Sequence, residues 1–348
     1  MAKTMYNLGD VAVKSCVSKS TASRILNNKL GNGFTVKKEV RKRVLEVAAR
    51  LNYRPNLIAQ SLTNHSIQMI HVLGGHHALS DLGNIYQTVV NNITSVVDSA
   101  GKDFDVTVDM SIPKPNSSEL PAWKIDGVIV LAWCTDNTVK DMEGRGIPYV
   151  VVNGPSGPGG SSVTLDDIGG TKLAIRKFVE LGHRNIAYAG PRKDHLSGHS
   201  SLTERHETYL EEMARYGLTP VVGHCDEFNS AEAFLESTVI KSGATAILAY
   251  GHMEGLNLMQ AAHKLEIAVP GRLSLICFCD EYANSVMSPG MAFVDLRSRD
   301  MGHTAAQLLL KQLGLSSAFK PEHIKLEEKL IVRESIVPPC MTDEWIKK

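Results

Sequence analysis

The sequence lacks the long apolar runs and the cysteine pattern that mark several protein classes. No stretch of 18 apolar residues occurs, so we expect no transmembrane helix. The first residues carry no apolar run after Lys3, so we expect no secretory signal. The chain has 6 cysteines in 348 residues, with no repeating spacing. This argues against a disulfide framework and favours the reducing cytoplasm.

The signatures of common enzyme and metal sites are also missing. The glycines of Gly154–Gly160 do not fit a nucleotide-binding fingerprint, and no serine nucleophile motif or phosphate loop stands out. Three pairs come closest to a metal-ligand set, namely His76 with His77, His195 with His199, and Cys277 with Cys279. None is completed by further ligands at a suitable spacing. We therefore expect a protein that is not an enzyme and holds neither cofactor nor metal.

The sequence carries no net charge, but its charges are unevenly distributed. Residues 1–64 hold 12 lysines and arginines and only 3 acidic residues. The remaining residues hold 25 basic and 34 acidic side chains, so they are net negative. A basic head on an acidic body predicts a polyanionic partner for the head alone. An ordinary solvated cationic surface is the alternative, and composition does not separate the two.

Two short helices are predicted between Leu8 and Leu26, broken at Cys16-Val17. Asn7 and Ser18 stand where side-chain oxygens cap helix starts. Apolar or small residues recur at helical spacing through both segments, at Leu8, Val11, Ala12, Val17, Thr21, Ala22, Ile25 and Leu26. Two short helices joined by a tight turn favour a helix-turn-helix motif, with a generic helical hairpin as the alternative.

A third helix is predicted from Val36 to Leu51, with Thr35 as its N-cap and Asn52 at its C-terminal end. Its apolar stripe consists of Val40, Val44, Val47, Ala48 and Leu51, and its outward face consists of Lys37, Lys38, Arg41, Lys42 and Arg43. Pro55 can begin a further helix of about two turns, which would need a partner to become ordered. Its apolar Leu62 has no evident core to enter.

From Ile67 onwards, short apolar strands alternate with amphipathic helices. The predicted strands are Met69–Leu73, Val106–Asp109, Gly127–Trp133, Tyr149–Val152, Ile186–Ala189, Ala246–Tyr250, Leu273–Phe278 and Ala292–Leu296. The predicted helices are Asn84–Ala100, Gly169–Leu181, Leu202–Tyr216, Ala231–Lys241, Gly255–Leu265 and Ser298–Leu313. This pattern is typical of parallel sheets covered by helices on both faces, and its length suggests two such sheets.

Four blocks of sequence resemble the lactose/galactose repressor (LacI/GalR) family of bacterial transcription regulators. They are Asp10-Val-Ala with Val17-Ser-Lys-Ser-Thr-Ala-Ser-Arg-Ile-Leu-Asn27; Arg43-Val-Leu-Glu-Val-Ala-Ala-Arg-Leu-Asn-Tyr-Arg-Pro-Asn56 with Ala59-Gln-Ser-Leu62; Leu181-Gly-His-Arg-Asn-Ile-Ala-Tyr-Ala-Gly-Pro191; and Val269-Pro-Gly-Arg-Leu-Ser274 with Ile331-Val-Arg-Glu-Ser335. They span nearly the whole chain in the family's order.

The resemblance implies an all-α helix-turn-helix headpiece, a hinge helix, and an α/β core of two doubly wound parallel-sheet subdomains, like a type I periplasmic binding protein. The implied domains are a headpiece at 1–54, a hinge helix and linker at 55–65, an N-subdomain at 66–165 and 294–322, a C-subdomain at 166–293 and 323–340, and a tail at 341–348. The chain would cross between the subdomains three times, so neither would be contiguous.

The resemblance also assigns DNA-binding roles to individual residues of the head. Lys19 and Ser20 match the two variable base-reading positions, and Arg24 matches a further base-contacting position. Ser18, Thr21 and Ser23 match positions that contact phosphates or cap the helix, Ala59 matches a small position near the base edges, and Leu62 matches the residue that wedges into the minor groove. Lys and Arg suit guanine, whose O6 and N7 are acceptors. The alternatives are a solvated lysine for Lys19 and core packing for Leu62.

An effector site between the subdomains is implied in the same way, although this sequence departs from the family there. The matching positions are Tyr86, Trp133, Asn153, Arg205, His252 and Asp280. Arg205 is the strongest of them, because a guanidinium offers a rigid fork to two oxygens. A surface salt-bridge arginine is the alternative. Family acidic residues are replaced at Asn153, at Gly251-His252 and at Cys279. Such a lining suits a sugar, a sugar acid or a phosphorylated ligand.

The resemblance therefore predicts a homodimeric cytoplasmic regulator, associated with the nucleoid and expected to be a repressor. It would bind a pseudo-palindromic DNA operator under the control of a sugar-like effector, and it would have no membrane partner. A periplasmic-type solute-binding protein, a sugar hydrolase, and a regulator that has lost small-molecule control are the alternatives. Induction and corepression remain equally open.

Overall fold

The computed structural model describes residues 6–26, 35–51, 53, 68–78, 85–101, 104–112, 114, 117–191, 199–225, 228–281, 288–314 and 320–340. The chain divides into two compact units, and each is described by itself. The head comprises Met1–Ile67, with which Ala122–Lys124 are grouped, and the core comprises Gln68–Pro121 and Ile125–Lys348. The predicted hinge helix at 55–65 and the tail at 341–348 lie outside the described residues.

The head consists of three helices, α1 (Leu8–Lys14), α2 (Lys19–Leu26) and α3 (Lys38–Arg50). The Asn7 side chain accepts from the Gly9 and Asp10 amides, and Ser18 Oγ accepts from the Thr21 amide at 3.1 Å, so both predicted caps are confirmed. The chain turns between α1 and α2 with Cys16 at a φ of 52°. The three helices share a small core of Val11, Ala12, Ala22, Ile25, Val44, Val47 and Ala48.

The third helix starts later than predicted. Its N-cap position is Lys37, which makes no side-chain capping hydrogen bond, so the prediction of Thr35 as the cap is wrong. The C-cap position is Leu51, and Asn52 lies outside the described residues. The predicted division into an apolar stripe and an exposed basic face is confirmed, with Val44, Val47 and Ala48 buried.

The core contains two six-stranded sheets. The first has the order β11-β5-β4-β3-β1-β2, and all its neighbouring strands are parallel. Its strands are β1 (Met69–Leu73), β2 (Asp105–Val108), β3 (Gly127–Leu131), β4 (Tyr149–Val152), β5 (Ser161–Leu165) and β11 (His323–Leu326). The second has the order β12-β10-β9-β8-β6-β7. Its strands are β6 (Ile186–Gly190), β7 (Val221–His224), β8 (Ala246–Ala249), β9 (Ser274–Cys279), β10 (Ala292–Asp295) and β12 (Lys329–Ile331).

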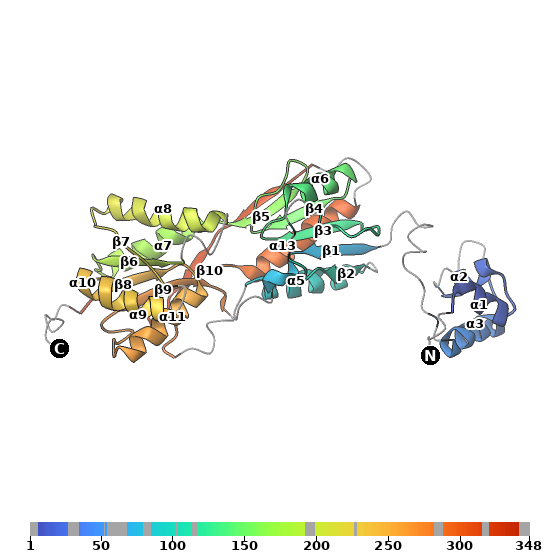
Figure 1. Cartoon of the computed structure of the whole chain (residues 1–348), viewed down its shortest axis with the longest axis horizontal. Coiled ribbons are helices and arrows are strands. Elements are labelled where there is room, and N and C mark those ends of the chain that lie inside the picture. The colour runs from blue at the N-terminus through green and yellow to red at the C-terminus, as the bar shows by residue number, and fades with distance from the viewer. Residues whose placement is uncertain are drawn as a thin grey trace. The chain divides into compact units, whose positions relative to one another are not determined.

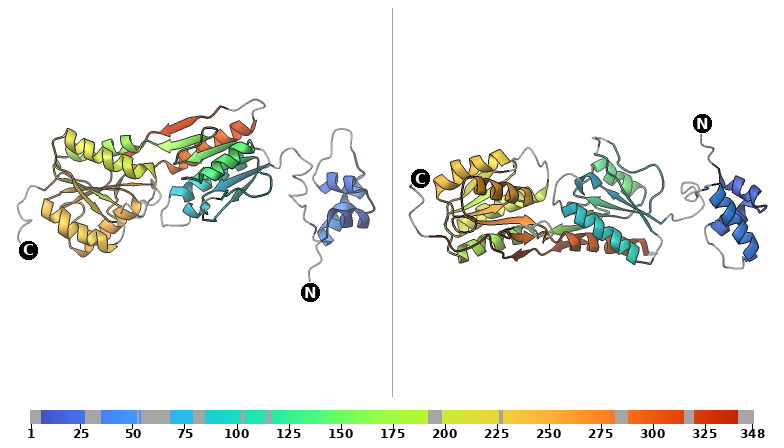
Figure 2. Two further views of the ribbon diagram at one scale, coloured as in Figure 1. Left: turned by 45° about the horizontal axis from the view of Figure 1, so that its top comes forward. Right: turned by 90° about the horizontal axis from the view of Figure 1, so that it is seen from below.

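Helices cover both faces of each sheet (Figures 1 and 2). In the first half, α5 (Ile85–Ser99) and α13 (Ser298–Gly314) lie side by side on one face and α6 (Asp136–Gly144) lies on the other. In the second half, α7 (Asp167–Glu180) and α8 (Ser200–Arg215) cover one face. The opposite face is covered by α9 (Phe228–Phe234), a π-helical turn (Leu235–Val239), α10 (Ile240–Ser242) and α11 (His252–Lys264). No helix in these described ranges is long and apolar enough to span a membrane.

The chain passes between the two sheets three times, as predicted, but two of the predicted boundaries are wrong. Val294 and Asp295 belong to β10 of the second sheet, whereas the prediction placed them in the first half. His323–Leu326 forms β11 of the first sheet, whereas the prediction placed it in the second half. The crossings therefore fall at Leu165-Asp166, at Leu296-Arg297 and at Glu327-Glu328.

Edge strands account for most other differences from the prediction. β12 runs antiparallel to β10, so the second sheet is mixed rather than purely parallel. The strands β5, β7, β11 and β12 and the helix α6 were not predicted from the sequence.

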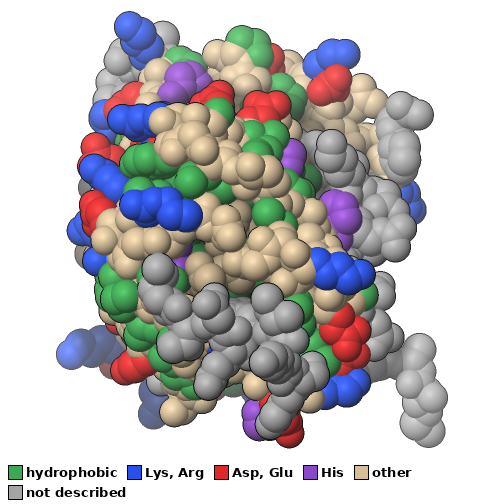
Figure 3. Space-filling model, turned by 90° about the vertical axis from the view of Figure 1, so that its left-hand side faces the viewer, with side chains coloured by type: hydrophobic (Ala, Val, Ile, Leu, Met, Phe, Trp, Pro, Cys, Tyr) green, Lys and Arg blue, Asp and Glu red, His purple; other side chains and the backbone are tan. Residues whose placement is uncertain are grey.

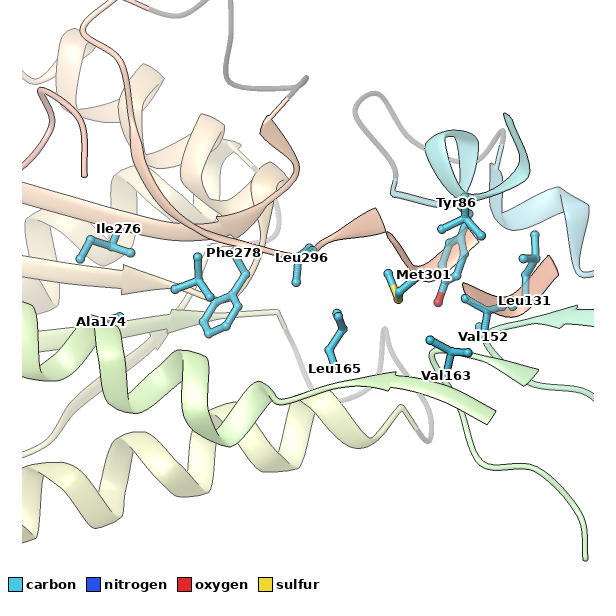
Figure 4. Packing of buried hydrophobic residues seen from close by; sticks show 14 of the residues in the cluster. Tyr86, Leu131, Val152, Val163, Leu165, Ala174, Ile276, Phe278, Leu296 and Met301 are labelled. Atoms are coloured by element: carbon cyan, nitrogen blue, oxygen red, sulfur yellow. The ribbon is translucent and has the colours of Figure 1, made fainter. Parts of the chain in front are cut away.

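One hydrophobic cluster extends through both halves. Figure 4 shows Leu165 and Leu296, each beside a crossing, lying between the group around Phe278 and the group around Tyr86 and Met301. The two halves are therefore joined by packed side chains as well as by the backbone.

Candidate DNA-reading face and effector site

The predicted DNA-reading residues lie together on the outer side of α2. Ala22 and Ile25 are buried against the other helices, and this orientation leaves Lys19, Ser20 and Arg24 exposed. The first turn is fixed by hydroxyl contacts, since Ser18 Oγ lies 2.8 Å from both Ser20 Oγ and Thr21 Oγ1. Ser18 is exposed, while Thr21 and Ser23 are partly exposed. Ala59 and Leu62 lie outside the described residues.

Arg43 supports this face in a way that the sequence analysis missed. Its Nε donates to the carbonyl oxygen of Ser15 at 3.0 Å, so α3 is tied to the end of α1, directly before the turn. The turn sets the angle at which α2 is presented. Because the acceptor is a backbone atom 28 positions away, no short-range sequence pattern reveals this contact.

In the core, Arg205 on α8 is enclosed by protein groups. Its Nε and Nη2 both contact Asp167 Oδ1 at 2.6 Å, and Nη1 donates to the carbonyl oxygen of Tyr250 at 2.6 Å. The guanidinium carbon also lies 3.9 Å from the centroid of the Phe278 ring and 4.8 Å from that of Tyr250. Burial lowers the pKa of Arg205, but the combined effect of Asp167, Tyr250 and Glu328 outweighs burial, so the net effect is a raised pKa. Arg205 is therefore a buried, charged and largely compensated group.

Tyr86 and Asn153 meet at the carboxyl edge of the first sheet. Asn153 follows β4 in a left-handed conformation (φ 61°), and its Nδ2 donates to the Tyr86 hydroxyl at 3.1 Å. Tyr86 is buried, which raises its pKa although the hydrogen bond from Asn153 opposes this. Trp133 follows β3 at the same edge and is 45% exposed. The structure thus brings Tyr86 and Asn153 together and leaves the Trp133 ring accessible.

His252 and Asp280 follow neighbouring strands of the second sheet. His252 is the first residue of α11 and is partly exposed. Asp280 follows β9, and its Oδ2 accepts a hydrogen bond from the hydroxyl of Ser298 at the start of α13. The Asp280 carboxylate is therefore engaged beside the second crossing. Within the described ranges, no cluster of three or more histidine, cysteine or acidic side chains is arranged to hold a metal ion.

His199, weighed in the sequence only as a metal ligand, is a site residue that the sequence analysis missed. It caps α8, with Nδ1 3.3 Å from the Ser201 amide and 2.7 Å from Ser201 Oγ. Its Nε2 lies 2.8 Å from the carbonyl oxygen of Asn153, which belongs to the other half of the core. Ser201 Oγ in turn lies 2.8 Å from the Tyr250 hydroxyl.

Comparison with known proteins agrees with this architecture. Residues 7–56 match the family model for bacterial regulatory proteins of the lacI family, and residues 175–336 match that for a periplasmic binding protein-like domain. The HTH-type transcriptional regulator RegA of Clostridium saccharobutylicum is 26% identical, over 95% of this chain and 99% of its own length. Catabolite control protein A of Staphylococcus xylosus is also 26% identical, with coverage of 93% and 96%.

Solved structures share the fold over the full chain. The lac repressor dimer, bound to operator and the anti-inducer ONPF, has a TM-score of 0.75 at 23% identity and covers 96% of this chain and 100% of its own. The complex of the transcriptional regulator CelR with cellobiose has a TM-score of 0.63 at 22% identity, with coverage of 95% and 99%.

The head and the two-sheet core together define a helix-turn-helix transcription regulator with a periplasmic-binding-protein-like core. The chain thus combines a head of the lacI family of bacterial regulatory proteins with a periplasmic binding protein-like domain, and it is similar over nearly its whole length to transcription regulators.

Proposed function

We propose that this protein is a repressor whose head reads a DNA operator through the outer side of α2. The observation that carries this is the exposed set of Lys19, Ser20 and Arg24 on a helix whose opposite side is buried. The basic excess of residues 1–64 supports it, because DNA binding is driven largely by phosphate neutralisation. On the face shown in Figure 3, in contrast, basic and acidic side chains are interspersed.

Operator selection from a random DNA library, followed by binding measurements, tests this proposal. Lys19→Ala should weaken binding to the selected site by about 1–3 kcal/mol more than binding to random DNA, because it removes a base contact. Lys42→Ala is the charge-matched control, since Lys42 is an exposed head lysine on α3 and not on the reading helix α2. It should weaken both kinds of binding equally. If Lys19→Ala also affects them equally, Lys19 does not read bases.

We also propose roles for Ala59 and Leu62, which rest on the family resemblance alone. Ala59 would lie near the base edges, and Leu62 would enter the minor groove and kink the duplex. Leu62→Ala should then weaken operator binding far more than binding to random DNA. Equal losses on the two DNAs would remove the wedge assignment.

The effector is proposed to bind between the two sheets, near Arg205, Tyr86, Asn153 and the accessible Trp133, with His252 and Asp280 at the neighbouring strand ends. We expect a neutral, hydroxyl-rich ligand, because the charge of Arg205 is already balanced by Asp167. A neutral sugar can still use the remaining guanidinium N–H groups and stack on an aromatic ring. Similar regulators of known structure bind cellobiose or ribose, which supports this class.

A thermal-shift panel of neutral sugars, sugar acids, sugar phosphates and nucleobases tests the ligand class. A ligand at 100 times its dissociation constant should stabilise the protein by about 2.7 kcal/mol. Neutral sugars should produce such a shift, whereas a response confined to acids or phosphates would contradict the charge argument. The absence of any shift would favour a regulator without small-molecule control.

We further propose a homodimer that acts in the cytoplasm, where its DNA lies. Effector binding would alter the arrangement of the two core halves and so the hinge segments, with a coupling free energy of about 1–3 kcal/mol. Operator affinity measured with and without the sugar found in the panel gives this coupling and its sign. An unchanged operator affinity would show that the ligand does not control DNA binding.

A further inference from the structure

A continuous set of hydrogen bonds passes from one half of the core to the other through His199. On the second half it begins at the Tyr250 hydroxyl, which lies 2.8 Å from Ser201 Oγ, and it continues to His199 Nδ1 at 2.7 Å. His199 Nε2 then contacts the carbonyl oxygen of Asn153 at 2.8 Å. On the first half, Asn153 Nδ2 donates to the Tyr86 hydroxyl at 3.1 Å. The set therefore joins residues of the effector site on both sides.

The donors and acceptors fit only one protonation state of the imidazole. The Asn153 carbonyl can only accept, so His199 Nε2 must carry a proton. Nδ1 accepts from the Ser201 amide, so it must be unprotonated. Ser201 can then donate its hydroxyl proton to Nδ1 and accept from Tyr250. The neutral Nε2–H tautomer satisfies every member of the set. In the imidazolium, Nδ1 would carry a proton and would face the Ser201 amide, which is also a donor.

We propose that the hydrogen bond from His199 to the Asn153 carbonyl, here called the His199 bridge, holds the two halves of the core in the arrangement in which Arg205 and Tyr86 share one site. The three chain crossings and the packed side chains around Leu165 and Leu296 already join the halves, and the bridge adds a polar contact that opening would break. His199 is thus a positioning residue. The proposal concerns the core without ligand, so it stands apart from the identity of the effector.

The surroundings of His199 favour the neutral state. Arg205 lies on the same helix, and His77, on the 3-10 turn Gly75–Ala78, interacts electrostatically with His199. Burial lowers the pKa of His199 and Arg205 lowers it further, while Asp167 and the Asn153 carbonyl oppose them. His76 lies beside His77, and the hydroxyls of Tyr86 and Tyr250 also face the cluster among the residues that the structure describes.

Two substitutions separate the bridge from the helix cap. Asparagine places its side-chain oxygen where Nδ1 stands and is a favoured N-cap residue, but it has no atom at the position of Nε2. His199→Asn should therefore keep the cap and lose the bridge, and His199→Ala should lose both. Tyr86→Phe is the matched control, since it removes the far hydroxyl and leaves the bridge intact.

Opening is measured in the full-length protein by single-molecule energy transfer. Dyes are attached to unnatural amino acids at Ile112 and Ile240, which are exposed in the first and second halves, and the labelled chain is diluted into unlabelled chain. Hydrogen exchange of the Ser201 amide reports the cap separately. We expect the open fraction to be threefold to tenfold larger in His199→Asn and His199→Ala than in the wild type. This factor corresponds to the loss of about one hydrogen bond. Ser201 exchange should rise only in His199→Ala.

A wild-type open fraction in His199→Asn would overturn the proposal and leave His199 as a helix cap only. The proposal would also be overturned if Tyr86→Phe raised the open fraction as much as His199→Asn does. The bridge would then contribute no more to closure than the hydrogen bond between Asn153 and Tyr86. The wild-type protein provides a measurement that needs no variant. Its open fraction should rise as the pH falls from 7.5 to 5.5, whereas that of His199→Asn should change less. An identical pH response in the two proteins would contradict the bridge.

Discussion

Arg205 and Asp167 form an ion pair whose two side chains are 6% and 4% exposed, and Asp167 is the first residue of α7 after the first chain crossing. The pair ties α8 to the start of α7, and Arg205 extends the connection to the carbonyl of Tyr250. The predicted effector arginine is therefore also a structural residue of the second half.

Removing one partner of this pair should destabilise the core strongly. Asp167→Asn leaves the Arg205 charge buried without its counter-ion, which typically costs about 3–5 kcal/mol of unfolding free energy. Urea unfolding at pH 7.5 measures the loss. Asp166→Asn is the neighbouring control, since Asp166 makes no capping hydrogen bond and its pairing with Lys325 is long, at 3.9 Å. A loss in Asp167→Asn as small as in that control would contradict the structural role.

Glu328 should make the core less stable as the pH rises. It is 5% exposed at the third crossing, and neither carboxyl oxygen has a hydrogen-bond partner among the described residues. Burial raises its pKa to about 8, with Asp167 and Asp166 adding to the effect and Arg205 opposing it. Because the folded-state pKa exceeds the unfolded one, stability is full below about pH 4.5 and declines as the pH rises towards 8.

Glu328→Gln tests this at the same size without the ionisable group. Between pH 5 and pH 7.5, the unfolding free energy of the variant should rise relative to that of the wild type by on the order of 2–3 kcal/mol. Glu327→Gln, at the exposed adjacent position, should leave the pH profile unchanged. If the free energy of unfolding of Glu328→Gln and of the wild type changed with pH in the same way, ionisation of Glu328 would cost the folded state little free energy.

Acid should destabilise the core through His77. Burial lowers its pKa to about 4, helped by His76 and His199. The folded state thus favours neutral His77, so its contribution is present above about pH 6.5 and is lost as the pH falls towards 4. His77→Gln should reduce the slope of the unfolding free energy against pH in that range, by at most about 1.4 kcal/mol per pH unit. His263→Gln, at an exposed site on α11, is the control and should leave the slope unchanged.

The cap at the start of α1 should be worth about 1 kcal/mol to the head. Asn7 accepts from the Gly9 amide at 2.7 Å, and Asp10 reciprocates by accepting from the Asn7 amide at 2.8 Å. Asn7→Ala should remove this contribution, seen as faster hydrogen exchange at Gly9 and Asp10. Asn7→Asp keeps a capping oxygen and should restore the protection. Equal exchange in both variants would mean that the cap does not hold the helix start.

The salt dependence of DNA binding should report how many phosphates the head contacts. A dimer that neutralises about eight phosphates has a log–log slope near −7. Lys19→Ala changes two side chains per dimer, so any phosphate contribution of Lys19 would reduce the slope by up to about 2. Lys241→Ala, on α10 of the core, should not change it. A wild-type slope near zero in a mobility-shift series would argue against a DNA-binding head.

Much of the fold was predictable because its central strands are apolar throughout. Met69–Leu73 and Tyr149–Val152 were predicted with the observed bounds, and both are buried along their whole length. β5 begins with two serines, and β7 and β11 alternate between more and less exposed residues, so an apolar-run criterion misses them. α6 buries only Thr138 and Met142, which is too narrow a stripe to signal a helix.

The site was less predictable because its contacts join residues far apart in the sequence. The match of Arg205 to a family position identified that residue, but nothing near it in the sequence indicated Asp167 as its partner. His199 was weighed only by its spacing from His195, while its partner is the carbonyl of Asn153. Ser298 engages Asp280 across 18 positions. These pairings arise only once the two sheets have formed.

The three crossings also bear on how the protein is made. Both sheets contain a strand that is translated near the end of the chain, β11 in the first and β12 in the second. A nascent chain leaving the ribosome therefore cannot complete the first half until the ribosome has passed Leu326, or the second half until it has passed Ile331. A premature stop shortly before His323 would leave two unfinished sheets rather than one intact half, so truncated products should be substrates for proteases.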